Sequence, residues 1–170
     1  MVMHSTQHNA ALHDEMAIRN LAAAYSHAVM RCDGNAAAEV YAEDGELIAF
    51  NAPAIVGRKA IAQAFCQTFE PLEFIVQTCT AGLIDIDGDA ARASWSVMEW
   101  MRHRGKEDLG VCMGVYEDIL RRTPDGWRFT RRTFQPFYRG TVPAKGKTYQ
   151  EVVYAHNYAP WPFVGNHTAG

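Results

Sequence analysis

The sequence predicts an α+β fold: a cone-shaped barrel in which three N-terminal helices pack on a curved, mixed and mostly antiparallel sheet. Apolar residues recur with the helical period near 3.6 between Asp14 and Phe69, and with period 2 between Glu73 and Arg139. The chain has 170 residues, of which 48% are hydrophobic, so one domain with a substantial core is expected. Helices that close such a cone leave an apolar cavity of the kind that holds small molecules.

The helical part begins with a flexible tail, because residues 1–13 are polar and carry no periodic apolar face. The first helix is expected over Asp14–Arg31, where Tyr25 lies on the apolar stripe and acidic residues suit the helix N-terminus. Two shorter helices are expected over Ala36–Tyr41 and Arg58–Phe69.

The strand part consists of one short strand, Glu46–Asn51, and four long ones. The four long strands are Glu73–Ile86, Ala90–Arg104, Leu109–Arg122 and Trp127–Arg139. Asp87-Gly88, a polar loop and Pro124-Asp125-Gly126 separate them, which predicts an antiparallel meander. Residues 140–170 form an aromatic-rich extension that is expected to pack on its own domain or on a neighbouring subunit, in a homodimer or homotrimer.

Composition excludes several classes of function. The net charge of −3 gives no basic surface for nucleic acid, and no apolar run reaches the ~18 residues of a membrane span. The four cysteines show no CxxC spacing, and the N-terminus does not resemble a signal peptide, so a reducing, cytoplasmic location is expected. No metal-binding motif is present, and no metal site is predicted.

One acid falls out of pattern in the second long strand. Counting by twos from Ala91 to Met101 gives the residues of one strand face, and Glu99 is the only charged residue among them. Such a carboxylate is either a structural acid, for example paired with Arg132, or part of a functional site.

Five segments follow in the order of a known family. They are AIRNLAAAYSHAV, AAEVYAEDGEL, VGRKAIAQAF, IDIDGDAARASW and GVYEDILRRTPDGWRFTRR. The chain resembles the SnoaL-like families of the nuclear-transport-factor-2-like superfamily over residues 14–139. Relatives include scytalone dehydratase, bile-acid dehydratase, hexachlorocyclohexane dehydrochlorinase, steroid isomerase, polyketide cyclases and lignin-dimer γ-formaldehyde lyases. The resemblance implies proton-transfer chemistry without a cofactor, although this fold hosts many reactions.

The dehydratase branch implies four site positions, of which this chain keeps two. The tyrosine position is Tyr25 and the second acid is Glu99, whereas the aspartate position is Met30 and the histidine position is Gln77. Since Met30 and Gln77 cannot act as a general base near neutral pH, Glu99 becomes the candidate base. An apolar setting would raise its pKa towards working pH.

The remaining candidate roles follow from the same comparison. Tyr25 would act as acid or oxyanion donor, Gln77 would orient a substrate oxygen, and Met30 and Trp95 would form an apolar wall. Asp44 would lie at the pocket mouth. Tyr25, Gln77 and Trp95 are also compatible with structural roles, as core residues or, for Gln77, as a structural hydrogen-bonding group.

The leading functional hypothesis is a cofactor-independent lyase acting on a small aromatic or polycyclic hydroxylated substrate. The elimination would release water, or formaldehyde from a 1,3-diol. The alternatives are a non-catalytic protein that binds a small hydrophobic molecule, which the loss of the Asp/His pair favours, and an isomerase or cyclase that uses the same pocket.

Overall fold

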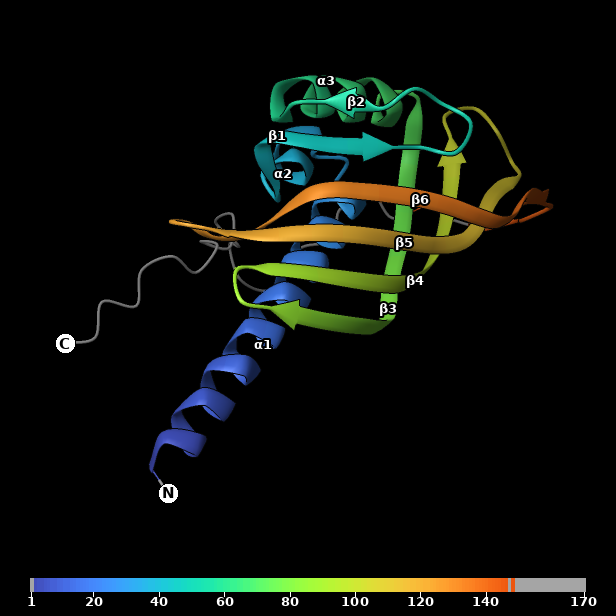
Figure 1. Ribbon diagram of the computed structural model, residues 1–170. Helices are drawn as coiled ribbons and strands as arrows, with labels where there is room; N and C mark the ends of the chain where they lie inside the picture. The colour runs from blue at the N-terminus through green and yellow to red at the C-terminus, as the bar shows by residue number, and fades with distance from the viewer. Residues whose placement is uncertain (1, 147, 149–170) are drawn as a thin grey trace.

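The computed structural model describes residues 2–146 and 148 (Figure 1). The elements in chain order are α1 (Val2–Met30), α2 (Gly34–Ala38), β1 (Tyr41–Ile48), β2 (Ile55–Val56), α3 (Arg58–Phe69), β3 (Leu72–Asp87), β4 (Ala90–His103), β5 (Leu109–Thr123) and β6 (Gly126–Val142). Helices precede a run of long strands, which confirms the predicted α+β fold class. Among the described residues, no helix is long and apolar enough to cross a membrane.

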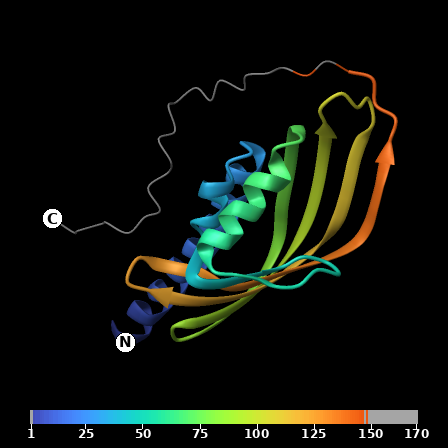
Figure 2. The same ribbon diagram turned by 90° about the horizontal axis from the view of Figure 1, so that it is seen from above.

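The six strands form one curved sheet in the order β2-β1-β6-β5-β4-β3. Only β1 and β6 run parallel; every other neighbouring pair is antiparallel. Figure 2 shows the sheet curving around α1, α2 and α3, which all lie on its concave side. The predicted mixed, mostly antiparallel sheet covered by helices is therefore confirmed.

The core lies between the helices and the concave face. The predicted α1 stripe is buried, and α3 contributes Ile61, Phe65 and Phe69. The sheet supplies alternate residues of each strand, including Trp95 on β4 and Tyr116 on β5. The aromatic rings of Tyr25, Tyr41 and Phe65 contact one another across the two layers.

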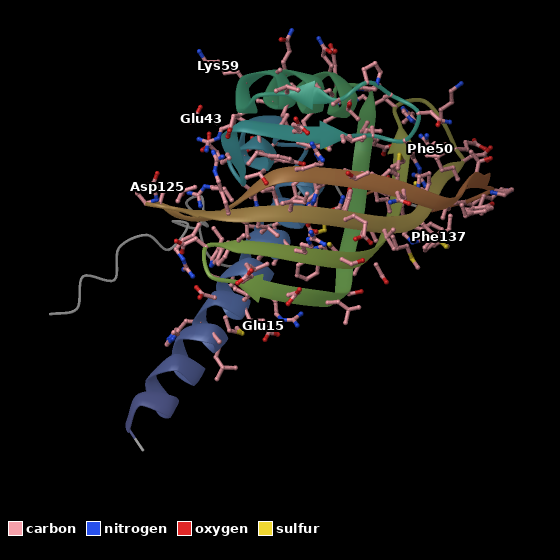
Figure 3. The ribbon with its side chains drawn as sticks, in the orientation of Figure 1. Glu15, Glu43, Phe50, Lys59, Asp125 and Phe137 are labelled. Atoms are coloured by element: carbon pink, nitrogen blue, oxygen red, sulfur yellow. The ribbon has the colours of Figure 1, made fainter. Side chains whose placement is uncertain are left out.

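The sheet has two different ends. We call the end with the β5–β6 turn the closed end; there Asp14 of α1 accepts hydrogen bonds from Arg122 and Trp127. We call the opposite end, with the β4–β5 loop, the open end. In Figure 3, Asp125 marks the closed end and Phe137 lies towards the open end of β6.

Two helix boundaries differ from the sequence-based prediction. The expected flexible tail is wrong for residues 2–13, which continue α1 without a break. Extending an existing helix adds one hydrogen bond for each residue fixed, and Ala10 and Ala11 favour helix. The second helix ends at Ala38, because Tyr41 pairs with Phe129 in β1. Sheet pairing and burial override the local helical pattern there.

Strand boundaries differ less. β1 begins before the expected Glu46, the two-residue strand β2 lies within an expected loop, and β6 continues past Arg139 to Val142. The rest of the predicted extension, at 147 and 149–170, lies outside the described residues, so its packing stays a prediction.

Candidate functional site

A row of side chains crosses four strands in the open half of the concave face. Gln77 on β3 pairs with Glu99 on β4, Glu99 with Cys112 on β5, and Cys112 with Arg139 on β6. Directly paired residues of antiparallel strands share one face of a sheet. The sequence-based placement of Glu99 on the inner face is therefore correct, and Arg139 joins it there.

Gln77 links Glu99 to α1. Its Nε2 donates to Glu99 Oε1 at 2.8 Å and to the Tyr116 hydroxyl at 3.2 Å. Its Oε1 accepts a hydrogen bond from the Ser26 hydroxyl at 2.8 Å. Both Ser26 and Gln77 are buried. Ser26 thus fixes the amide so that its NH₂ group faces Glu99. The role predicted for Gln77, orienting a substrate oxygen, stays a prediction.

Burial raises the pKa of the Glu99 carboxyl above its ordinary value, and the opposing contributions are too small to cancel this effect. Those contributions are the Gln77 hydrogen bond, the charge of Arg139 and hydrogen bonding to Tyr116. The Glu99 side chain is only half-buried and does not form an ion pair with Arg132. Burial therefore shifts this carboxyl towards its protonated form relative to an exposed glutamate.

Tyr25 lies deeper, beneath this row. Its ring packs edge-on against Tyr116 with centroids 5.9 Å apart. Burial raises the pKa of Tyr25 to about 12, although Arg132 and hydrogen bonding to Tyr116 oppose the rise. Tyr116 interacts with Tyr25 on one side and with Glu99 on the other, so it connects the two predicted catalytic residues. Both phenols are neutral at pH 7.

A buried ion pair occupies the closed half of the same face. Arg132 Nε donates to Asp118 Oδ1 at 2.8 Å, and its NH2 donates to Oδ2 at 2.6 Å. The Trp95 indole also donates to Asp118 Oδ2, at 2.9 Å. Both charged side chains have zero exposure. Burial opposes the charged form of Arg132, but the Asp118 carboxylate holds the pKa of Arg132 well above its usual value.

Three aromatic rings surround the Arg132 guanidinium. Its central carbon lies 4.4 Å from the Tyr25 centroid, 4.3 Å from Tyr116 and 4.1 Å from Phe129. Such cation–π contacts stabilise a desolvated charge. Arg132 NH1 and the Tyr41 hydroxyl are buried polar atoms without a hydrogen-bond partner among the described residues. The positive charge of Arg132 thus contacts the rings of both Tyr25 and Tyr116.

The structure separates the remaining predicted residues. Met30 follows Ser26 by one turn of α1 and lies on the same side of the helix. Trp95 is buried and holds Asp118, which gives it a structural contact rather than a free wall position. Asp44 is wrongly placed by the prediction: it is exposed and pairs with Arg121 near the closed end, because it lies in the first half of β1, which runs parallel to β6 from the closed end towards the open end.

A hollow with a volume of about 740 Å³ lies at the open end of the sheet. Its lining residues come from β4, the β4–β5 loop, β5 and β6: Met101, His103, Lys106, Glu107, Asp108, Gly110, Val111, Cys112, Arg139, Gly140 and Thr141. Glu99 does not line the hollow itself, but it pairs with Cys112 and is two residues from Met101 on the same face, so it lies next to the hollow. In the described part of the chain, no group of three His, Cys, Asp or Glu residues could hold a metal ion.

The sequence-based interpretation missed Ser26, Tyr116, Asp118 and the burial of Arg132. Counting by twos along β5 from Gly110 to Leu120 would have found Asp118 and Tyr116, by the same signal that identified Glu99. Ser26 gives no such signal, because a helical serine beside an apolar stripe is common.

The curled sheet, the covering helices and the acid at the inner face define a protein of the nuclear-transport-factor-2-like class. The chain belongs to the SnoaL-like domain family, which matches residues 10–133. No protein of curated function matches the sequence. The family match over residues 10–133 confirms the predicted family.

Solved structures agree on the fold. An NTF2-like protein with a cystatin-like fold from Novosphingobium aromaticivorans is 26% identical, with a TM-score of 0.73 over 81% of this chain and 90% of that one. A candidate scytalone dehydratase from the same organism is 18% identical, with a TM-score of 0.73 over 87% and 99%. A hexachlorocyclohexane dehydrochlorinase is 14% identical, with a TM-score of 0.74 over 81% and 95%. The fold thus includes enzymes of several kinds.

Proposed function

We propose that the protein is a cofactor-independent lyase acting on a small aromatic or polycyclic hydroxylated substrate. The observation that carries the proposal is Glu99: a half-buried carboxyl with a raised pKa, held by an amide instead of a cation, next to a hollow. A base whose pKa lies near the operating pH is the requirement for general acid–base catalysis. Tyr116 and Tyr25 supply neutral phenols on the same side.

In a dehydration, Glu99 takes a proton from carbon, the electron pair forms the double bond, and the C–O bond breaks. The departing hydroxyl takes a proton from the Tyr116–Tyr25 phenol pair and leaves as water, and the proton on Glu99 returns to the phenols. In a 1,3-diol, Glu99 takes the terminal hydroxyl proton, the C–C bond breaks, and formaldehyde leaves. The electron pair then forms the alkene and expels the second hydroxyl, which leaves as water after protonation.

The test is turnover by Glu99→Gln on a panel of aryl-1,3-propanediols and hydroxylated polycycles. Removing a general base typically lowers the rate by about 10²–10⁴-fold, and this is the expected loss in kcat. Glu117→Gln is the matched control, because Glu117 is an exposed acid on the other face of β5 that bonds Ser94. Its turnover should stay within about twofold of the parent protein. Full turnover by the Glu99 variant would refute the proposal.

A non-catalytic binding protein is the second candidate, and Gln77 is the observation in its favour. The residue at the histidine position of the dehydratases makes three hydrogen bonds here, to Ser26, Glu99 and Tyr116, and carries no titrating proton. Tight binding of a small hydrophobic molecule without turnover, unchanged by Glu99→Gln, would support this function. Product analysis separates the lyase from an isomerase or cyclase.

The expected homodimer or homotrimer also stays a proposal, as does the cytoplasmic location. Light scattering of the full chain gives the oligomeric state, and a monomer would contradict the association expected from the aromatic extension.

A further inference from the structure

Arg139 is the only cation in the row that crosses the open half of the concave face. Through Cys112 it lies two strands from Glu99. Because neighbouring strands are about 4.8 Å apart, the two backbone positions are separated by roughly 10 Å. That span accommodates one aromatic ring with a substituent at each end.

β5, the strand between these two residues, carries only small side chains on its inner face beside the hollow. On β5, Gly110 and Cys112 are successive inner-face residues and both line the hollow. A Cβ atom on Gly110 would lie 3.1 Å from Met101 Cγ, so a larger side chain would intrude on the space beside Met101. This surface is flat and uncharged, which suits the face of a ring.

Arg139 lines the hollow and has no carboxylate partner among the described residues, whereas four other arginines of the sheet have one. Arg121, Arg122, Arg131 and Arg132 each pair with a carboxylate. No described residue forms a salt bridge with Arg139, although Glu107 and Asp108 line the same hollow together with His103 and Lys106. Burial raises the pKa values of Glu99 and Cys112, and the charge of Arg139 opposes part of both rises. Its five donors are thus available to a ligand in the hollow.

We propose that Arg139 binds an anionic group carried on the aromatic ring of the ligand, with the ring over Gly110 and Cys112 and the opposite substituent at Glu99. The inference rests on the proposed function for the role of Glu99, and it narrows the substrate class to hydroxylated aromatic acids. A planar guanidinium binds a carboxylate through two parallel hydrogen bonds, and such charge-assisted bonds fix orientation as well as affinity.

Two fluorescent probes with the same ring system test the anion site without requiring turnover. 8-Anilinonaphthalene-1-sulfonate carries an anionic group, and N-phenyl-1-naphthylamine lacks it. We expect Arg139→Gln to weaken binding of the sulfonate by about tenfold or more, as loss of a charge-assisted hydrogen bond predicts, and to change binding of the neutral probe less than about twofold. Arg139→Lys should recover part of the affinity, because it keeps the charge without the fork.

Arg131→Gln is the matched control. It removes the same charge from the same strand, but Arg131 lies on the opposite face and pairs with Glu46. It should leave both titrations unchanged. Displacement of the sulfonate probe by 1-naphthoate, but not by 1-naphthylmethanol, would extend the result to carboxylates.

Several outcomes would overturn the anion site: equal effects of the Arg139 and Arg131 substitutions, equal losses for both probes, or no binding of either probe to the parent protein. None of these depends on turnover. A protein that loses activity with Glu99→Gln but binds both probes equally would keep the proposed lyase function and refute the anion site. If Arg139→Gln weakens binding of the sulfonate alone while Glu99→Gln keeps full turnover, the anion site stands and the lyase function is refuted.

Discussion

Asp118 and Glu99 lie on the same face of the sheet in opposite halves, and they differ in their hydrogen-bond partners and in their burial. Asp118 receives two hydrogen bonds from Arg132 and one from Trp95, and it is fully buried. Glu99 receives one from Gln77 and is only half-buried. The closed half gives its acid a permanent cation, whereas the open half gives its acid a neutral amide.

The difference teaches what turns a buried acid into a candidate base. Burial raises the pKa of both carboxyls, but at Asp118 the Arg132 guanidinium opposes the rise and occupies both carboxylate oxygens. An amide donates one hydrogen bond and leaves the carboxyl able to titrate. Burial alone therefore does not distinguish the two acids; the charge of the partner does.

The largest expected effect comes from breaking the closed-half pair. Asp118→Asn leaves the Arg132 charge buried without its counter-ion, and such changes cost about 3–5 kcal/mol of unfolding free energy. Urea denaturation followed by circular dichroism measures the loss. Arg131→Gln removes an exposed arginine next to it and should change stability by less than about 0.5 kcal/mol. A loss below about 1 kcal/mol for the Asp118 variant would contradict the comparison.

Replacing Glu99, the acid of the open half, should not destabilise the protein at neutral pH. The pKa of Glu99 is raised in the folded protein, so the folded state binds the proton more tightly than the unfolded one. The stabilisation from Glu99 is then fully present below its unfolded pKa near 4.5 and is lost as pH rises through the folded pKa.

Glu99→Gln removes this dependence. In urea denaturation from about pH 4 to about pH 8, the parent protein should lose stability relative to the variant as the pH rises. At neutral pH the variant should be as stable as the parent or more so, because a neutral amide at this position carries no charge that burial would desolvate. A difference that is independent of pH would show that Glu99 has an ordinary pKa.

The smallest effect is expected at Ser26. Ser26→Ala removes the hydrogen bond that fixes the Gln77 amide and should lower the unfolding free energy by about 1 kcal/mol. It also frees the amide to turn its oxygen towards Glu99, which would raise the pKa of Glu99 further. The pH dependence defined by the Glu99 comparison should therefore move to higher pH, and Ser26→Thr should restore it. An unchanged pH dependence would leave Ser26 a purely structural role.

Periodicity predicted the long strands, and with them the inner face of β4, because a strand side chain must alternate between two faces. The same rule fails on β6. The register between β5 and β6 shifts between Ile119 and Leu120. Leu120 pairs with Phe129, but Asp118, two residues away, pairs with Arg132. Counting by twos from Phe129 would place Arg131 inside and Arg132 outside. A β-bulge reverses that assignment, and no sequence signal identified it here.

The placement of Asp44 failed for a related reason. The sequence predicts that the first strand begins at Glu46, but Asp44 already lies within β1, at an irregularity in its pairing between Tyr41 and Glu46. Pairing with β6 decided where the strand begins, and that partner is distant in sequence. Glu99 was placed on the correct face because β4 alternates without interruption from Ala91 to Met101, although the register with β3 shifts between Thr80 and Leu83.

The parallel pairing of β1 with β6 has a consequence for how the chain is made. Leu47 pairs with Arg132, so one edge of β1 finds its main-chain partners only after the last described strand has been made, and its other edge pairs only with the two-residue strand β2. The ion pair of Asp118 also depends on β6, because its counter-ion, Arg132, lies on that strand. During synthesis on the ribosome, the helices and β1 are exposed before the sheet can form. Folding is therefore expected to be slow and to finish late, as is usual when contacts join distant parts of a chain.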